Sequence, residues 1–426
     1  MRLLERDASL ATLRALQAEA TSSGGRLVFI EGEAGVGKTS LLGAFRSSLP
    51  DSVRTLLGTC DPLSTPRPLG PFVDIADDLD PGFARIVHDE GPREAMLGAL
   101  LAALRLEGRA LVLQIDDLHW ADEATLDALR FVGRRIESTR ALVVGTYRDD
   151  EVGRQHPLRV VVGDLATSAA VRRLPLHALS IASVGELARG TDLDPTELHT
   201  QTGGNPFYVT EVIAGAPARI PSTVRDAVLA RAARLSPGAR ATLEATAVIG
   251  PTVEPGLLAR VIDRPEAEEC LENGLLQVDG RRYAFRHELS RQAVLDAMDP
   301  SRRSALHARV LAALEAGPVT ERPPAILAHH ADEAGDRAAV LRYAPQAARD
   351  AAAAGAHRQA AAQLARARPY LDDLPEAERG ALLEAYAREH SLIARYDVVF
   401  EASEEAIAIW HALGDARTRR SRRFAT

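Results

Sequence analysis

The chain has 426 residues, of which 46% are hydrophobic, and a formal net charge of −8 at pH 7. Because a chain of this length and hydrophobic content buries real cores in about two to four domains, a disordered or fibrous protein is excluded. The negative net charge also excludes a protein that coats nucleic acid with its whole surface. A local basic patch remains compatible with this net charge.

Cysteine usage and the N-terminus indicate the compartment. Cys60 and Cys270 lie far apart and lack the spacing of a metal site, which predicts no disulfide framework and fits a reducing environment. Glu5 and Asp7 stand where a signal peptide needs an apolar run, and no stretch approaches about 18 consecutive apolar residues. We expect a cytoplasmic protein with no membrane partner.

Residues 1–177 alternate between helix-like and strand-like segments. Apolar residues at helical spacing predict a helix within 3–20. Buried strands are predicted at 27–30, 54–58, 110–115, 141–146 and 171–176. Strands that lack period-two patterning and alternate with helices imply a parallel sheet covered on both faces. The prediction is an α/β nucleotide-binding core.

The strands stop after about residue 178. Ser180 and Asp194-Pro195 are typical helix starts, and residues 178–216 are predicted to form a helical lid. Beyond a Pro-containing linker, residues 217–300 are predicted to form short helices followed by a hairpin and a helix. The hairpin signal is Asp279-Gly280, within the alternating segment 275–286. This order predicts a winged-helix domain.

Residues 301–426 are Ala-rich and predicted to be helical throughout. Helices are predicted at 338–348, 357–370, 376–394 and 396–413. Gly335-Asp336 and Gly414-Asp415 flank the two helix pairs, which indicates a repeat of about 34–40 residues, as in tetratricopeptide-like (TPR-like) solenoids. A plain helical bundle is an open alternative, because Ala-rich sequence forms helix readily anywhere.

A phosphate-binding loop follows the first predicted strand. Gly32-Glu33-Ala34-Gly35-Val36-Gly37-Lys38-Thr39 has the spacing Gly, four residues, Gly-Lys-Thr, and a predicted helix follows it, as the motif requires. Backbone N–H groups of such a loop surround phosphate oxygens, the lysine reaches the β- and γ-phosphates, and the threonine hydroxyl binds Mg²⁺. We therefore expect ATP or ADP with Mg²⁺ to bind residues 32–39 and Ser40.

Lys38 is the only lysine of the chain, and all other basic residues are arginine. Codon bias of a GC-rich genome explains the general replacement of lysine. It does not explain why position 38 kept one. The planar fork of arginine is a poor substitute for a compact ammonium group among loop N–H groups, which supports a phosphate-binding role.

Two acids end the apolar run Leu111–Ile115. Asp116 is predicted to supply the second ligand on the Mg²⁺ side, because ligands of open α/β sheets bind at the carboxyl ends of the strands. Asp117 is predicted to orient or deprotonate the attacking water. Many related ATPases carry glutamate there, and the shorter side chain predicts slow hydrolysis.

Arg148 follows the strand predicted at 141–146. An arginine at this sheet edge is able to sense the γ-phosphate and to couple its loss to movement. In so Arg-rich a chain, a surface salt bridge is the competing interpretation.

Six motifs in order resemble the ATPase half of the STAND class, specifically large ATP-binding LuxR-type (MalT-like) transcriptional regulators. They are Leu4-Glu5-Arg6, the phosphate loop, Asp116–Asp122, Thr146-Tyr147-Arg148, Gly203–Phe207 and Phe285–Leu289. The resemblance covers about residues 1–300. It implies a P-loop ATPase core of the AAA+/STAND type, a winged helix and TPR-like helices.

The resemblance also implies two further nucleotide contacts. Asn205 and Pro206 belong to a Gly-Asn-Pro element that is similar to the hinge that packs near the adenine in the class. His287 corresponds to the winged-helix histidine that contacts the phosphates in the closed ADP form. A simple turn at Asn205-Pro206 and a local hydrogen bond at His287 are the structural alternatives. For Trp120, the structural alternative to a role in the site is packing in the core.

The resemblance further implies a C-terminal DNA-binding helix-turn-helix, which the sequence does not show, so we expect a helical region that is cut short. The favoured function is a nucleotide-dependent signalling switch in transcriptional regulation, which associates with itself or with another protein through the helical region. One alternative is an AAA+/Orc-like ATPase that binds DNA through arginines of the winged helix: Arg281, Arg282, Arg286 and Arg291. Another is the sensory lobe of a separate signalling enzyme such as a nucleotide cyclase or a protein kinase.

Overall fold

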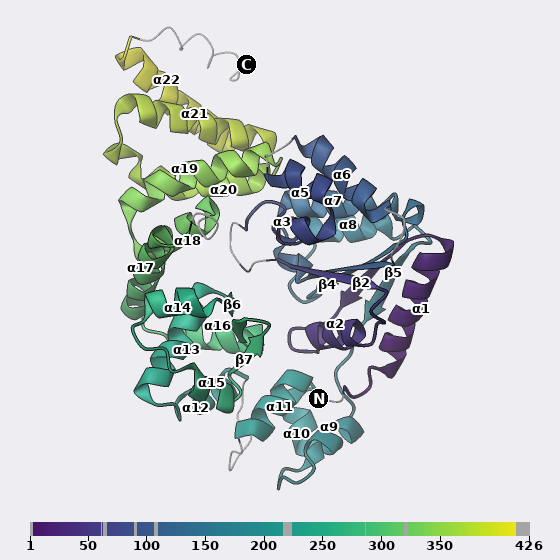
Figure 1. Ribbon diagram of the computed structural model, residues 1–426. Helices are drawn as coiled ribbons and strands as arrows, with labels where there is room; N and C mark the ends of the chain where they lie inside the picture. The colour runs from purple at the N-terminus through teal and green to yellow at the C-terminus, as the bar shows by residue number, and fades with distance from the viewer. Residues whose placement is uncertain are drawn as a thin grey trace.

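The computed structural model describes residues 3–60, 62, 66–88, 92–105, 110–215, 224–285, 287–318 and 323–414. A three-layer α/β unit forms one side of the molecule, and a column of helices forms the other (Figure 1). The N-terminal helix α1 (Asp7–Ser23) lies at the outer edge of the α/β unit, far from the last helices.

Five parallel strands form the central sheet, in the order β2-β3-β4-β1-β5. Their bounds are Arg26–Glu31 for β1, Arg54–Thr59 for β2, Leu111–Asp116 for β3, Ala141–Tyr147 for β4 and Val171–Pro175 for β5. All five lie where the sequence predicts strands. In β4 every residue is buried, as expected of a central strand that is covered on both faces.

The two faces of the sheet carry different helices. Val28 and Ile30 of β1 pack against α1 and α2 (Lys38–Ser47), whereas Leu27 and Phe29 pack on the opposite side. This second layer contains α3 (Gly70–Asp74), α4 (Ala76–Leu79), α5 (Pro81–His88), α6 (Arg93–Arg105), α7 (Glu123–Gly133) and α8 (Pro157–Leu165). Alternate strand residues therefore supply two separate cores.

Three short helices follow the sheet and lie beneath it in Figure 1. They are α9 (Ile181–Leu187), α10 (Pro195–Thr202) and α11 (Pro206–Gly215). Ser180 and Asp194 cap the first two by accepting hydrogen bonds from the backbone N–H groups of Ser183 and Glu197. The helix starts predicted at 180 and 194 are confirmed. The predicted linker falls mainly on residues outside the described ones.

The next unit combines helices with a small antiparallel sheet. Its helices are α12 (Val224–Ala232), α13 (Pro237–Ile249), α14 (Pro255–Val261), α15 (Ala267–Glu272) and α16 (Glu288–Ala297). The sheet has the order β6-β8-β7, from Thr252–Val253, Arg282–Phe285 and Leu276–Asp279. Gly280 has a φ of 59° in the turn between β7 and β8, at the predicted hairpin.

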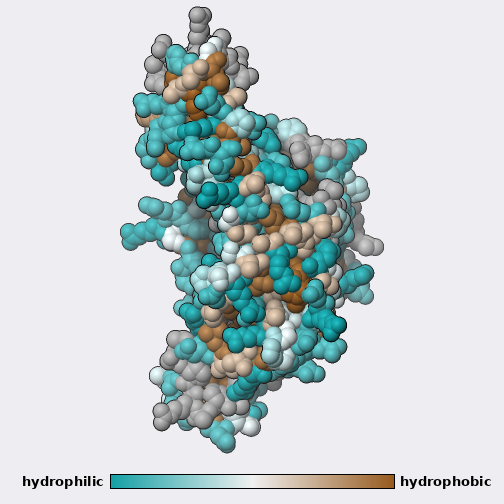
Figure 2. All heavy atoms as spheres, turned by 90° about the vertical axis from the view of Figure 1, so that its left-hand side faces the viewer, coloured by the Kyte–Doolittle hydropathy of each residue, from teal (hydrophilic) through white to brown (hydrophobic). Residues whose placement is uncertain are grey.

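The remaining helices stack as antiparallel neighbours along the chain (Figure 1). They are α17 (Pro300–Ala316), α18 (Pro324–Ala334), α19 (Arg337–Ala353), α20 (His357–Ala367), α21 (Glu376–Leu392) and α22 (Tyr396–Ala412). Figure 2 looks onto this side, where hydrophobic side chains are interspersed among polar ones. In the last two helices Leu392 and Phe400 are exposed hydrophobic residues. Within the described ranges, the search for a helix long and apolar enough to cross a membrane found none.

The α19–α20 hairpin packs against the α/β unit. Ala351, Ala356 and Ala360 are buried in the same core as residues of α6 and α7. The backbone N–H of Arg358 donates to Glu123 in the first turn of α7, over 3.4 Å. Because alanine side chains are small, these helices approach closely and join the column of helices to the α/β unit.

Candidate functional site

The phosphate loop lies between β1 and α2, at the carboxyl edge of the sheet. Its Gly37 has a φ of 102°, and Gly35 a φ of 80°, a region that other residues rarely enter. A Cβ at Gly35 would come within 2.8 Å of Asn205 Oδ1, whereas one at Gly37 would meet no atom within 4 Å. The loop is therefore contacted by Asn205 and Phe207 on one side and is open at Gly37, which leaves space for a phosphate there.

Lys38 closes the loop on itself. Its Nζ donates to the carbonyl oxygens of Gly32 and Glu33, over 2.6 and 2.9 Å. Burial lowers the pKa of the ammonium group, and the nearby Asp117 carboxylate opposes this effect. A buried ammonium group that touches uncharged carbonyls is well placed to bind the β- and γ-phosphates of a nucleotide.

Asp116 joins the loop to the two central strands. Its Oδ2 accepts from Thr39 Oγ1 over 2.9 Å, and its Oδ1 accepts from Thr146 Oγ1. The hydroxyl and the carboxylate are hard oxygen donors of the kind that Mg²⁺ prefers. The donor set fits the ion that the sequence predicts at Thr39 and Asp116.

Asp117 has backbone and electrostatic features of its own. Its φ is 60°, and its N–H donates to Thr146 Oγ1 over 3.0 Å, which fixes the turn after β3. Burial and the neighbouring Asp116 raise the pKa of its carboxyl to about 7, against the attraction of Arg148 and Lys38. A carboxyl that titrates near neutral pH suits a group that accepts a proton from water.

His119 is a site residue that the sequence analysis missed. It lies in the 3₁₀ turn Leu118–Trp120, fully buried, with Nδ1 3.8 Å from Asp117 Oδ1 and Nε2 3.7 Å from Glu151 Oε2. Neither ring nitrogen makes a hydrogen bond within the part of the chain that the structure describes. Burial, reinforced by Arg148, lowers its pKa to about 3, so the ring is neutral. The sequence signal was its place in the Asp116–Asp122 motif.

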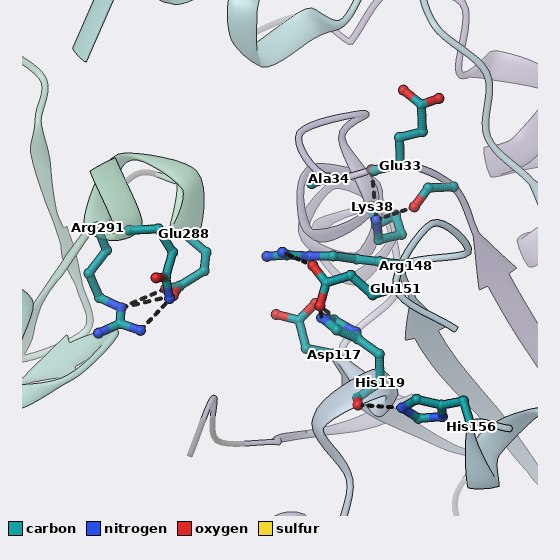
Figure 3. A network of polar contacts seen from close by, with 12 residues as sticks. Glu33, Ala34, Lys38, Asp117, His119, Arg148, Glu151, His156, Glu288 and Arg291 are labelled. Atoms are coloured by element: carbon teal, nitrogen blue, oxygen red, sulfur yellow. Dashed lines mark hydrogen bonds and ion pairs between the residues drawn. The ribbon is translucent and has the colours of Figure 1, made fainter. Parts of the chain in front are cut away.

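Arg148 forms the salt bridge that was the competing interpretation, while its position leaves a role at the phosphate loop as a prediction. Its guanidinium pairs with Glu151 and lies over the Trp120 ring, 4.8 Å from the ring centre. It is also 8% exposed, and in Figure 3 its side chain passes between Lys38 and Asp117 and extends toward α16. The salt bridge therefore positions the arginine at the site, and Trp120 supports it as well as packing against the core.

Asn205 connects the start of α11 to the phosphate loop. Its Nδ2 donates to the carbonyl of Ala34 over 2.8 Å, while its Oδ1 accepts from the N–H of Phe207 at the start of α11. The N–H of Phe207 also donates to the carbonyl of Gly35. Pro206 is the first residue of α11 and lines the same region. The Gly-Asn-Pro element thus contacts the loop and does not merely start a helix.

Replacement of Asn205 should loosen this connection. Asn205→Asp keeps the acceptor for Phe207 but places a carboxylate against the Ala34 carbonyl. We expect ATP affinity to fall about tenfold, since one buried hydrogen bond is worth about 1 kcal/mol and the new repulsion adds to its loss. Titration calorimetry measures the change, and Gln201→Glu, at an exposed position of α10, is the control. Equal affinities of Asn205→Asp and the parent chain would contradict the contact's role.

A small pocket beside the loop brings distant segments together. The pocket has a volume of about 60 Å³ and is lined by Leu4 and Arg6 near the N-terminus, by Gly35, Gly37 and Ser40, by Pro206 and Phe207, and by His287. The His287 ring packs on Phe207 with the ring centres 4.3 Å apart. Arg6 donates to the carbonyls of Val36 and His177 over 3.0 and 2.7 Å. Four stretches of the chain meet at the phosphate loop.

Two of the four arginines expected to contact DNA phosphates are engaged in other contacts. Arg291 is 7% exposed, pairs with Glu288 and donates to the carbonyl of Ala247, so its assignment to a DNA surface is wrong. Figure 3 shows this pair on α16, facing the Arg148–Glu151 pair. Arg282 pairs with Glu254 over 2.6 Å, and Arg281 is exposed. Arg286 and the C-terminal arginine run lie outside the described residues.

Comparison with known proteins agrees with this geometry. Residues 2–144 match the sequence model described as the AAA ATPase domain. An uncharacterised protein of Rhizobium meliloti (strain 1021) is 25% identical, with 78% of this chain and 39% of that protein covered. The chain therefore spans about two fifths of that curated relative.

One solved structure extends the likeness in fold over nearly the whole chain. A signal transduction ATPase with numerous domains (STAND) protein with a tetratricopeptide repeat sensor from Pyrococcus horikoshii gives a TM-score of 0.54 at 15% identity, covering 98% of this chain and 66% of that one. The Orc1 protein of Aeropyrum pernix in complex with DNA gives a TM-score of 0.37 at 16% identity, covering 70% and 93%. The sequence match and the fold identify residues 2–144 as an AAA ATPase domain, followed by a large helical region.

Proposed function

We propose that the chain is a nucleotide-dependent regulatory switch that binds ATP or ADP with Mg²⁺ and hydrolyses ATP slowly. Lys38 and the loop N–H groups bind the phosphates, and Thr39 and Asp116 hold the ion. When bound, Mg²⁺ neutralises charge on the β- and γ-phosphates. Asp117 orients the attacking water and accepts its proton, while Arg148 senses the γ-phosphate.

The observation that carries this proposal is the pocket shared by four parts of the chain. Arg6, Gly35, Phe207 and His287 come from the N-terminal segment, the ATPase domain, the lid and the unit that contains α16. A nucleotide bound beside this pocket contacts more than the ATPase domain. ATP and ADP differ in the γ-phosphate, so their affinities for the closed form, in which α16 lies against the loop, differ. This difference in affinity changes the ratio of closed to open molecules.

The finer assignments belong to the same proposal. The domains are 1–177 for the ATPase core, 178–216 for the lid, 217–300 for a winged helix and 301–426 for TPR-like helices. The STAND protein of similar fold has a tetratricopeptide repeat sensor, which supports a sensory role for α17–α22. His287 then contacts a nucleotide phosphate in the ADP-bound form. The output is transcriptional regulation of the LuxR type. It is exerted by a protein partner that binds the helical region.

The test compares the shape of the chain with ADP and with a non-hydrolysable ATP analogue. Small-angle scattering should give a larger radius of gyration with the analogue, because α16 and its neighbours leave the loop. Size-exclusion chromatography at the same concentrations separates opening from self-association. Identical scattering curves for both nucleotides, each at saturation, would reject the switch while leaving nucleotide binding intact.

DNA binding is not adopted as the function, since Arg291 is buried and Arg282 is paired. Duplex-DNA affinity that falls steeply with salt would reverse this judgement, because phosphate contacts release counterions. The scattering experiment and a DNA titration are therefore complementary.

The contact between α20 and α7 supplies a prediction about coupling. Ala360→Glu introduces a carboxylate into a fully buried position, which costs several kcal/mol unless the hairpin moves away. We expect the hairpin to undock and the steady-state ATPase rate to rise several-fold, as the helical region no longer biases the closed form. Ala365→Glu, at an exposed position of the same helix, is the matched control. Circular dichroism confirms that both variants keep their helix content, and equal rates would contradict the coupling.

A further inference from the structure

Three histidines meet in the column of helices, away from the phosphate loop. His307 belongs to α17, and His329 and His330 belong to α18. One ring nitrogen of each lies within 4.8 Å of those of the other two. The Nδ1 atoms of His307 and His330 are 2.9 Å apart, and the ring of His329 is centred 5.5 and 5.2 Å from the rings of His307 and His330.

The spacing is close to that of a metal centre. Two nitrogens bound to tetrahedral zinc at about 2.0–2.1 Å lie about 3.3 Å apart. The Nδ1 pair needs to separate by a few tenths of an ångström, and His329 needs to approach by a rotation of its side chain. The two helices are packed neighbours, so their backbones already hold the three side chains together.

A cavity of about 520 Å³ borders the cluster. Its walls come from three parts of the fold: the histidines and Val310 of the helical region, Gly250 and Arg291 near the small sheet, and Asp74 of α3. A metal held by three imidazoles keeps a fourth position for water or for a small ligand. The cavity provides space for that position.

The electrostatics favour neutral rings, the form that binds metals. Burial lowers the pKa of His307 to about 4 and that of His329 to about 3, and it lowers the pKa of His330 as well. Arginines nearby contribute to the shifts, but each has a carboxylate partner: Arg303 with Glu333, Arg366 with Asp332, and Arg291 with Glu288. The charge that opposes a cation is therefore largely compensated.

We propose that His307, His329 and His330 form a binding site for a divalent transition metal ion of the zinc type, with its open coordination position toward the cavity. Imidazole nitrogen suits Zn²⁺, Co²⁺, Ni²⁺ and Cu²⁺ and not the oxygen-seeking Mg²⁺ of the phosphate loop. The ion joins α17 to α18 where the helical region meets the rest of the chain. This site is independent of the nucleotide and goes beyond the proposed switch.

The first experiment titrates the full chain with Co²⁺, without nucleotide and in excess Mg²⁺. One equivalent should bind and give the visible absorption of a four- or five-coordinate ion. His329→Gln should weaken binding by about 100-fold, while His411→Gln, at an exposed position of α22, should leave it unchanged. Absence of stoichiometric binding, or equal affinities of the His329→Gln variant and the parent chain, would overturn the proposal.

X-ray absorption of the unmutated chain loaded with Zn²⁺ provides the second measurement, which does not depend on the folding of a variant. Three imidazole nitrogens at about 2.0–2.1 Å support the site. Fewer than three overturn it. Neither outcome depends on ATP binding, so failure here leaves the proposed switch untouched.

Discussion

Lys38→Ala should weaken ATP binding by about 100-fold or more. Lys38 is 6% exposed and its Nζ contacts two loop carbonyls, so the ammonium group is fixed where the β- and γ-phosphates are expected. Hydrogen bonds between charged groups contribute about 1.5–3 kcal/mol each. Loss of contacts to two phosphates then lowers the affinity for ATP by about 100-fold or more. Titration calorimetry measures the effect directly.

The controls for this prediction use the unusual composition of the chain. Arg46→Ala removes an exposed basic residue from the last turn of the same helix and should bind ATP normally. Lys38→Arg keeps the charge but not the shape and should also weaken binding, because the fork does not fit among the loop N–H groups. An amine reagent should label Lys38 besides the N-terminus, and ATP should block this labelling. If Lys38→Ala bound ATP with the affinity of the parent chain, the phosphate loop would not be the ATP-binding site.

The strands and the phosphate loop were predictable because their signals are local. A mostly apolar run of strand length such as 111–115, in a segment where strands and helices alternate, favours a buried strand. The spacing of Gly32, Gly37 and Lys38 belongs to one short segment. The carboxyl ends of parallel strands share one edge, so Asp116 and Arg148 could also be assigned to the same region.

Contacts between distant segments needed the structure. Nothing near Asn205 indicates that its side chain reaches the carbonyl of Ala34, 171 residues away. The resemblance suggested a place near the nucleotide but not this hydrogen bond. His307 and His330 are 23 residues apart and come together only because α17 and α18 pack side by side.

The assignment of Arg291 failed for a reason visible in the sequence. Glu288 precedes it by three residues on the same helix, a spacing at which opposite charges pair. The remaining burial comes from α13, whose Ala247 carbonyl accepts from Arg291. A basic residue on a predicted surface helix is therefore weak evidence for a nucleic-acid contact unless its helical neighbours are also considered.

Asp117→Asn should lower the ATPase rate by about 100-fold or more while leaving ATP affinity nearly unchanged. Asparagine fills the same space and keeps the backbone bond to Thr146, but it does not accept a proton, and general bases contribute about 10²–10⁴-fold to rates. In the parent chain the rate should rise as pH increases through about 7, the pKa of this carboxyl. Asp149→Asn, which alters an exposed carboxylate two residues beyond β4, is the control. If the ATPase rate of Asp117→Asn equalled that of the parent chain, another group would accept the proton from water.

The same substitution should stabilise the fold, with a dependence on pH that a purely structural change would not show. The folded pKa of Asp117 is about 7, against 3.8 for the ordinary group, so the folded state holds a proton that the unfolded state releases. The contribution of the Asp117 carboxyl to the free energy of unfolding is fully present below about pH 4, and it is lost as the pH rises through about 7. Asparagine stays neutral throughout. At about pH 8 chemical denaturation should show Asp117→Asn more stable by about 1–3 kcal/mol, and by less at about pH 5. A pH-independent difference would mean that the ionised carboxylate carries no cost in the fold.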